Sequence, residues 1–255
     1  MIRIKSAREI DRMAQGGAVL AAAREVLEKA VKPGISTLDL DRIAEDFIRS
    51  HPGAKPSFKG LYGFPGSICV SINNEIVHGI PSKKRVLREG DIVSIDIGVL
   101  FEGYHTDSAT TVAVGAIPDE SARLLDATRR ALDAGVLEAR AGNHIGDIGA
   151  AVQSVVAAAG FSVVKDLVGH GIGESFHEEP QVPNYGKPQR GTRLVPGLTI
   201  AIEPMVNAGK PDTRTMPDKW TIVTVDGSRS AHFEHTVAIT ENGPRVLTAS
   251  APPRP

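Results

Sequence analysis

The chain has 255 residues, 41% hydrophobic and 23% charged, which is the composition of an ordinary folded protein and excludes disordered or fibrous classes. Its 29 Lys and Arg residues nearly balance its 30 Asp and Glu residues, so the charge gives no sign of nucleic-acid or membrane binding. The single cysteine, Cys69, excludes an internal disulfide and fits a reducing compartment. We expect one cytoplasmic catalytic domain over residues 1–250, with a frayed tail at 251–255.

Helices are predicted to precede strands in each half of the chain. Apolar residues at helical spacing predict a helix from Ser6 to about Ala30, and a second helix capped by Ser36 or Thr37. A strand is expected over 67–77, and a hairpin over 91–99 and 106–114. Two more helices, over 119–140 and 144–159, are followed by strands at 198–206, 220–225 and 234–240.

This order of helix, helix and strands occurs twice, and short segments support a duplication. Residues 34–40 resemble 142–148, and residues 90–96 resemble 197–203. The segment that begins at Asp107 resembles the segment that begins at Glu234. We therefore predict one duplicated α/β domain with two halves about a pseudo-twofold axis, since periods this long do not indicate a solenoid.

Four carboxylates stand at matching strand ends of the two halves: Asp96, Asp107, Glu203 and Glu234. An ionised carboxylate in an apolar strand costs several kcal/mol unless it is paired or bound to metal. A single such residue could simply cap a strand. Two buried acids at matching positions of a duplicated unit are unlikely by chance and indicate a shared function. Because four facing carboxylates raise one another's pKa, they need cations to stay ionised. The sequence therefore predicts a dinuclear metal centre.

A nitrogen ligand is available in the glycine-rich segment Gly169-His170-Gly171-Ile172-Gly173. The glycines allow other groups to approach the imidazole closely. A phosphate-binding loop is the alternative for such a segment, but Glu174 breaks the G-x-G-x-x-G pattern. We therefore interpret His170 as a metal ligand.

These motifs together resemble a type I methionine aminopeptidase of the short bacterial kind, in the pita-bread metallopeptidase family. The resemblance implies an α/β (α+β) pita-bread fold, in which the duplicated halves surround a curved antiparallel sheet. It also implies two divalent ions (Co, Mn, Fe or Zn), with Asp107 and Glu234 bridging both. The stretches that carry the resemblance are 67–69, 78–81, Asp96, Asp107, 169–173, 177–178, 201–205 and 233–236. The ligands that it implies are Asp96, Asp107, His170, Glu203 and Glu234.

The implied activity is removal of the initiator methionine from nascent chains when the second residue is small, by hydroxide attack at the dinuclear centre. The resemblance assigns His78 and His177 to the substrate and the transition state, and Glu203 to proton transfer as well as ligation. Each histidine could instead be structural, and Phe64 and Trp220 could be ordinary core aromatics. The implied pocket for the first side chain comprises Tyr62, Phe64, Cys69 and Trp220.

Some positions depart from the pattern that the resemblance leads us to expect. Leu61 replaces an aromatic residue, Val77 precedes His78 where several relatives have Cys, and His232 stands where an amide or another polar side chain is expected. None of these positions is a predicted metal ligand. The resemblance also implies a monovalent-cation site near Asn73, Glu75 and Ser230. The remaining histidines are left as structural or outer-shell candidates: His51, His105, His144, His232 and His235.

The expected partner is the N-terminus of a nascent polypeptide, with the ribosome as a meeting place, and the chain is expected to act as a monomer. Three alternatives stay open. A proline-specific aminopeptidase or dipeptidase uses the same ligand types but normally carries an extra N-terminal domain, for which 255 residues leave no room. A binding module on the same scaffold would be expected to have lost ligands. A thiol hydrolase would need Cys69 and His78 in contact, although one straight strand would hold them roughly 30 Å apart.

Overall fold

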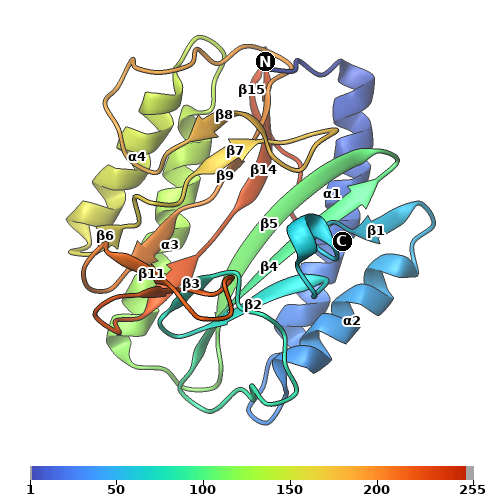
Figure 1. Ribbon diagram of the computed structural model, residues 1–255. Helices are drawn as coiled ribbons and strands as arrows, with labels where there is room; N and C mark the ends of the chain where they lie inside the picture. Colours follow the sequence, from blue (N-terminus) through green and yellow to red (C-terminus); the bar gives the residue numbers. More distant parts are fainter. Residues whose placement is uncertain (1, 251–255) are drawn as a thin grey trace, which may run out of the picture.

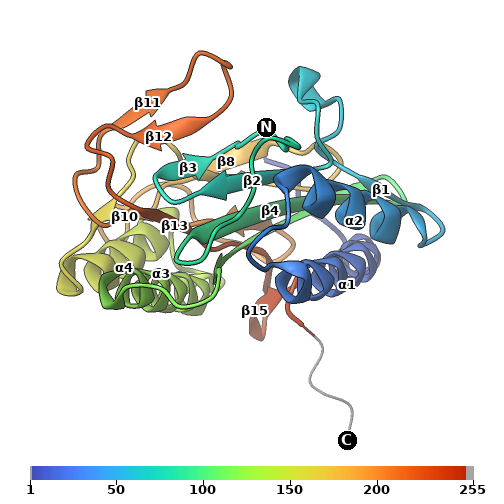
Figure 2. The same ribbon diagram turned by 90° about the horizontal axis from the view of Figure 1, so that it is seen from below.

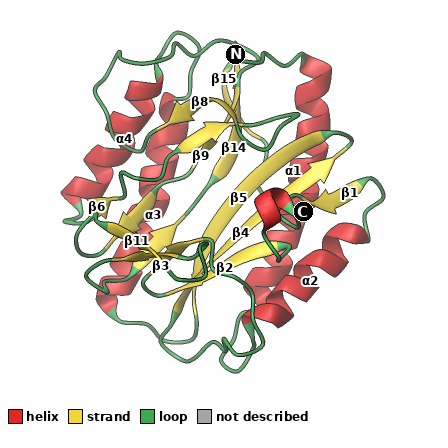
Figure 3. Cartoon of the chain, in the orientation of Figure 1, coloured by secondary structure: helices red, strands yellow, loops and turns green. Residues whose placement is uncertain are grey.

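The computed structural model describes residues 2–250, so the predicted frayed tail at 251–255 lies outside the described residues. Two helix pairs flank a central group of strands (Figure 1 and Figure 3). The first half contains α1 (Ala7–Ala30), α2 (Thr37–Arg49), β1 (Ala54–Pro56), a 3-10 turn (Leu61–Gly63), β2 (Ile68–Ile72), β3 (Glu75–Val77), β4 (Ile92–Phe101) and β5 (Tyr104–Ala113).

The second half repeats this order of helices and strands. Its elements are α3 (Asp119–Glu138), α4 (Ile145–Ala158), β6 (Ser162–Val163), β7 (Gly169–Gly171), β8 (Glu178–Val182), β9 (Thr199–Ile202), β10 (Met205–Asn207), β11 (Thr213–Thr215), β12 (Ile222–Thr224), β13 (Ser230–His232), β14 (His235–Thr240) and β15 (Gly243–Val246). The duplicated helix-helix-strands arrangement is therefore confirmed.

Helix starts follow the polar residues that the sequence offers as caps. The Ser6 side chain accepts the backbone N–H of Glu9, and the Glu9 carboxylate accepts the N–H of Ser6 at 2.6 Å. Ser36 and Asp39 form the same reciprocal pair at the start of α2. Such capping boxes satisfy N–H groups that have no partner within the helix.

The longest ladder is the hairpin of β4 and β5, which are paired continuously from Ile92 opposite Ala113 to Phe101 opposite Tyr104. Glu102 and Gly103 both have positive φ, 47° and 87°, as a two-residue hairpin turn requires. Strand β4 also pairs with β1 and β2, whereas the second half orders five strands as β15-β14-β9-β7-β8.

Two segments expected to be single strands are each divided in two. The segment 67–77 turns back at Asn73, where φ is 55°, and forms β2 and β3. The segment 198–206 is interrupted at Glu203 and Pro204, between β9 and β10. Proline has no N–H to donate to a ladder, and the interruption frees Glu203 from strand pairing.

The strand register shows which residues of the two halves are equivalent. Ser94 of β4 pairs with Thr111 of β5, and Ala201 of β9 pairs with Thr236 of β14. Because 90–96 correspond to 197–203, Ser94 corresponds to Ala201. Thr111 therefore corresponds to Thr236.

The same register relates the site residues of the two halves. Strands β10 and β13 extend the pairing of β9 and β14 in the same register, with Met205 opposite His232. Asp107, four residues before Thr111, therefore corresponds to His232, four residues before Thr236. The expected equivalence of Asp107 and Glu234 is wrong by two residues, because Glu234 corresponds to Ala109.

The helices cover one side of the strands, and β11 and β12 lie on the other (Figure 2). Each half has its own apolar cluster, one around β4 with α1 and α2, and one around β9 and β14 with α3 and α4. Within residues 2–250, no helix combines the length and the apolar character needed to cross a bilayer.

Helix α1 approaches its neighbours closely at two glycines. A Cβ on Gly16 would lie 2.8 Å from the Phe101 side chain, and a Cβ on Gly17 would lie 2.1 Å from the Leu247 carbonyl oxygen. The second contact is with backbone, which cannot rotate away as a side chain can. Gly17 therefore allows the C-terminal segment to lie against α1.

We predict that Gly17→Ala lowers the free energy of unfolding by about 1–3 kcal/mol, the usual cost of forcing extra atoms into a packed interior. At an exposed helix position the same change would instead stabilise by about 1 kcal/mol. Urea unfolding measures the difference, with the exposed neighbour change Ala18→Gly as the control for helix propensity. A more stable Gly17→Ala variant would contradict this account of the contact.

Candidate active site

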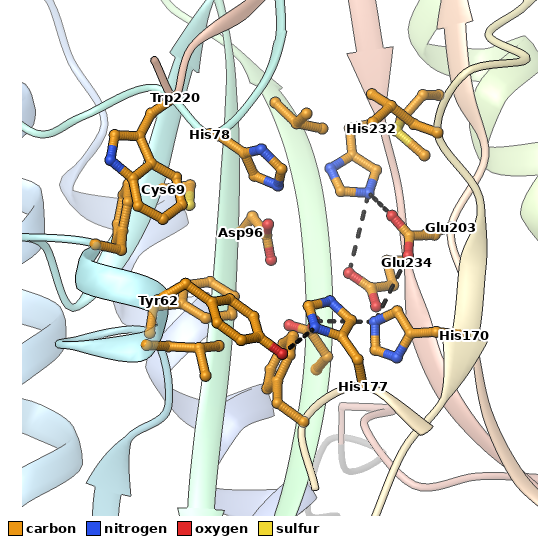
Figure 4. A pocket seen from close by; sticks show the side chains of 18 of the residues that line it. Tyr62, Cys69, His78, Asp96, His170, His177, Glu203, Trp220, His232 and Glu234 are labelled. Carbon is orange, nitrogen blue, oxygen red and sulfur yellow. Dashed lines mark hydrogen bonds and ion pairs between the residues drawn. The ribbon is translucent and has the colours of Figure 1, made fainter. Parts of the chain in front are cut away.

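All the residues predicted to bind the divalent ions or the substrate line a single pocket between the two halves (Figure 4). They come from separate elements: Asp96 from β4, Asp107 from β5, His170 from β7, Glu203 from the interruption after β9, and Glu234 from the residue before β14. The structure thus brings together residues far apart in the sequence. Their role as ligands stays a prediction.

The two halves are joined at this pocket by hydrogen bonds between β5 and the start of β14. The Asp107 N–H donates to the Thr236 hydroxyl, which in turn donates to the Asp107 carbonyl, both at 2.8 Å. The Glu234 N–H donates to the Ala109 carbonyl at 3.0 Å, and the Ser108 hydroxyl donates to the Glu234 carbonyl at 2.7 Å. The backbones that carry Asp107 and Glu234 are therefore fixed relative to each other.

His170 is oriented for metal binding by its neighbours. Its Nδ1 lies 2.8 Å from the Gly171 carbonyl, so Nδ1–H donates there and the Nε2 lone pair is free. Nε2 lies 3.8 Å from Glu203 Oε1 and 4.0 Å from Asp107 Oδ2. A Cβ on Gly169 or Gly171 would collide with a backbone oxygen of a flanking strand, so close packing of the strands requires glycine at both positions.

The arrangement fits divalent cations. Ligand atoms of Asp107, His170 and Glu234 all lie within 4.8 Å of one another. Among the described residues, no group hydrogen-bonds to Asp96 Oδ1 or Glu234 Oε1, although both atoms are buried. Buried carboxylate oxygens without partners are costly, and a cation between them would remove that cost.

The protonation equilibria of the isolated chain indicate the same need. Burial raises the pKa of Asp96 to about 6 and that of Glu203 to about 8. Burial and then neighbouring carboxylates also raise the pKa values of Asp107 and Glu234 well above their ordinary values. Without cations Glu203 would therefore be largely protonated at neutral pH and its neighbours would resist ionisation, whereas bound cations would favour the ionised forms.

His78 and His177 approach the pocket from outside the carboxylate cluster. Burial lowers the pKa of His78 to about 4 and also lowers the pKa of His177, so both imidazoles are neutral and can donate one N–H. The His177 ring lies 4.4 Å from the His170 ring, centroid to centroid. His78 has a positive φ of 60°, rare for a residue other than glycine, which turns it away from the line of β3.

Aromatic residues form the opposite wall of the pocket. The rings of Phe64 and Trp220 meet edge to face at 5.1 Å. Tyr62 stacks on His177 at 5.8 Å, and its hydroxyl lies 3.3 Å from Nδ1 of that histidine. Figure 4 shows Tyr62, Cys69 and Trp220 on one side of the pocket and His170, Glu203 and Glu234 on the other.

Cys69 and His78 line the same pocket, because the chain bends between them instead of continuing as one straight strand. The turn at Asn73 reverses the chain, and the Val70 N–H donates to the Gly79 carbonyl at 2.9 Å. Burial, together with the carboxylate of Asp96, raises the pKa of the Cys69 thiol. Because the thiolate is the nucleophilic form, this environment favours the interpretation of Cys69 as pocket wall.

The unexpected residues Leu61, Val77 and His232 also line the pocket. The sequence places His232 among the structural and outer-shell candidates, yet its Nε2 lies 3.6 Å from Glu203 Oε2 and 3.9 Å from Glu234 Oε2. A histidine two residues before a predicted ligand points to the same face of a strand. That alternation is the signal by which the sequence could have placed it.

The residues expected around a monovalent cation are only partly gathered. The Ser230 N–H donates to the Asn73 carbonyl at 2.8 Å. The Glu75 carboxylate, however, accepts the Ile72 N–H at 2.7 Å and pairs with Arg85. The monovalent-cation site stays a prediction.

Comparison with known proteins identifies the family. The profile of metallopeptidase family M24 matches residues 11–241. The chain belongs to metallopeptidase family M24. The methionine aminopeptidase 1 of Bacillus subtilis is 54% identical over 248 residues, which cover 97% of this chain and 99% of that protein.

Solved structures of the M24 family confirm the predicted pita-bread fold. The methionine aminopeptidase of Thermotoga maritima superposes with a TM-score of 0.96 and 43% identity, covering 98% of this chain and 100% of that one. An Xaa-Pro dipeptidase from Bacillus anthracis superposes with a TM-score of 0.79 and 25% identity, but the match covers 62% of the dipeptidase.

We predict that metal retention separates the two kinds of site residue in this M24 enzyme. Asp107→Ala should lose bound metal, because its carboxylate faces both His170 and the other acids. His78→Ala should keep its metal but lose kcat/KM by about 10²–10³-fold if the imidazole stabilises developing charge.

Metal per chain, measured by elemental analysis after gel filtration, and kcat/KM on one peptide test both statements. His51→Ala, at a histidine that does not line the pocket, is the control. Loss of metal from His78→Ala, with the rate per bound ion unchanged, would reverse the assigned roles.

Proposed function

We propose that this chain is a methionine aminopeptidase that removes the initiator methionine from new polypeptides when the second residue is small. The observation that supports this most is the juxtaposition of two surfaces in one pocket. One surface carries the acidic cluster with His170, and the other carries Tyr62, Phe64, Cys69 and Trp220. Such a pocket can hold one apolar side chain beside hydrolytic groups.

The residues that would hold two divalent ions are Asp96, Asp107, His170, Glu203 and Glu234. The ions would polarise the scissile carbonyl and lower the pKa of a bound water. Four carboxylates and one imidazole suit Mn, Fe, Co or Zn. This donor set supports a two-ion centre because the four negative charges of the ionised carboxylates match two divalent cations.

His78 and His177 would act on the substrate through hydrogen bonds. Both are neutral donors at the edge of the cluster, and a fixed donor stabilises an oxyanion more than a mobile one does. The Tyr62 ring stacks on His177 with centroids 5.8 Å apart, and the rings of Trp220 and His78 are nearly perpendicular with centroids 6.5 Å apart. Glu203, which bound cations would keep ionised, would accept a proton from the attacking water and return it to the departing amine.

The apolar wall would select the first side chain. A thioether is unbranched and polarizable, so it packs well against aromatic edges and sulfur. Phe64 and Cys69 are buried, whereas Tyr62 is 73% exposed and stands at the outer side of the pocket. Charged or β-branched first residues should fit poorly, because burying a charge against aromatic rings is costly and a β-branched side chain is stiffer than a thioether.

The substrates would be the N-termini of nascent chains, met in the cytoplasm as they leave the ribosome. Such N-termini are extended and carry a free amine. The chain is proposed to act on them as a monomer.

Removal of metal should abolish the activity. Dialysis against a chelator lowers the occupancy of the acidic cluster, and addition of a single first-row divalent ion should restore hydrolysis of a Met-Ala peptide. Residual metal is measured on the same sample. Full activity in a sample shown to be free of metal would overturn the metal-dependent mechanism.

Substrate preference should follow the pocket. Peptides that begin Met-Ala, Met-Lys, Leu-Ala and Ala-Pro, at equal concentration, should be cleaved fastest when Met precedes Ala. Free N-terminal amino acids are measured by mass spectrometry. If Ala-Pro were cleaved and Met-Ala were not, the methionine assignment would fall and a proline-specific peptidase would replace it.

A further inference from the structure

We propose that His232 is an additional ligand of the metal centre, a second imidazole that shifts its preference toward ions favouring nitrogen donors. The inference rests on the metal centre of the proposed function and goes beyond the five ligands implied by the family resemblance. It assigns His232 a direct contact with metal.

The first argument is the spacing of the donor atoms. His232 Nε2 lies 3.6 Å from Glu203 Oε2 and 3.9 Å from Glu234 Oε2, too far for a hydrogen bond. His170 Nε2 shows the same spacing, 3.8 Å and 4.0 Å, from oxygens of Glu203 and Asp107. Two donor atoms each ~2.1 Å from one ion lie about 3–4 Å apart. Each oxygen of Glu203 thus faces one imidazole.

The second argument is the position of His232 in the duplicated fold. It is the counterpart of Asp107 by strand register, and its backbone is held in the same way. The His232 N–H donates to the Thr111 hydroxyl, and that hydroxyl donates to the His232 carbonyl, both at 2.8 Å. Thr236 makes this reciprocal pair with Asp107. The fold therefore presents His232 to the centre as rigidly as it presents Asp107.

The third argument is that the His232 ring has no other partner. Its side chain is 2% exposed, and neither ring nitrogen forms a hydrogen bond within residues 2–250. A buried polar group without a partner destabilises the fold. A metal ion bound to the imidazole would remove this cost. Figure 4 shows the ring directed toward Glu203 and Glu234.

A second imidazole changes which ion the centre prefers. Zn, Co and Fe gain more from imidazole than Mn does, because Mn suits carboxylate and water ligands. We therefore expect this chain to favour Zn(II) or Co(II) over Mn(II) more strongly than a variant with one imidazole donor.

Nuclear magnetic resonance of the full-length protein tests the contact directly. The ¹⁵N signals of the histidine rings are recorded with and without stoichiometric Zn(II). Two ring nitrogens should move to metal-bound positions in the unmodified chain, and one of these signals should disappear in His232→Gln. A single metal-bound ring nitrogen in the unmodified chain, or two that persist in His232→Gln, would overturn the proposal.

Metal affinity gives a second readout that does not depend on activity. In competition titrations, His232→Gln should bind Zn(II) and Co(II) about 10- to 100-fold more weakly, with a smaller loss for Mn(II). His235→Gln is the matched control, because that ring lies one residue beyond Glu234 and contacts the Thr248 hydroxyl at 2.9 Å. An equal loss in both variants, or none in His232→Gln, would overturn the proposal.

Further measurements separate this inference from the proposed function. Thermal unfolding verifies that His232→Gln is folded, and His232→Asn repeats the test with a shorter amide if it is not. If His232→Gln keeps the Zn:Mn preference of the unmodified chain and still cleaves a Met-Ala peptide, His232 is not a ligand, but the proposed function is unaffected. If the unmodified chain binds no divalent ion, both the proposed metal centre and the role of His232 in it are refuted.

Discussion

Burial of like charges at the junction of the two halves is the constraint on which the rest of this structure depends. Asp96, Asp107, Glu203 and Glu234 lie where two ladders meet, and burial raises the pKa of each. Such a cluster opposes folding unless cations compensate for it. The hydroxyl of Thr236 and the paired backbones hold the carboxylates together despite their repulsion. Burial of the apolar clusters on either side stabilises the fold and offsets the unfavourable free energy of this repulsion.

The ladders also decide which residues reach the pocket. Side chains alternate along a strand, so Asp107 and Ala109 of β5 share one face with Asp96, which lies opposite Ala109. The break at Pro204 frees Glu203 from strand pairing while leaving it beside its neighbours. The M24 fold thus supplies a rigid frame, and only a few positions on it carry the chemistry. This explains how an Xaa-Pro dipeptidase can share the frame at a TM-score of 0.79.

Much of this arrangement follows from local sequence rules. Helices α1 and α2 begin directly after Ser6 and Ser36, because both residues form reciprocal caps, and the β4–β5 hairpin follows from an apolar run with Gly103 at its turn. The strand expected over 67–77 overlooks a local turn signal at Asn73-Asn74, since asparagine is one of the few residues besides glycine that adopt a left-handed conformation. The same turn brings Cys69 and His78 together. The offset of two residues between the halves could not be read from short similar segments, since only strand pairing determines register.

Duplication gives the site two equivalent positions that need not carry the same side chain. Asp107 and His232 occupy one such pair, each held by a threonine hydroxyl from the other half. Asp96 and Glu203 occupy another, in which Glu203 is displaced from its ladder by the following proline. Because the backbone support is the same in both halves, a side chain at one position can change without disturbing its counterpart. The ligand set can therefore become asymmetric in charge and donor type while the frame that positions it remains symmetric.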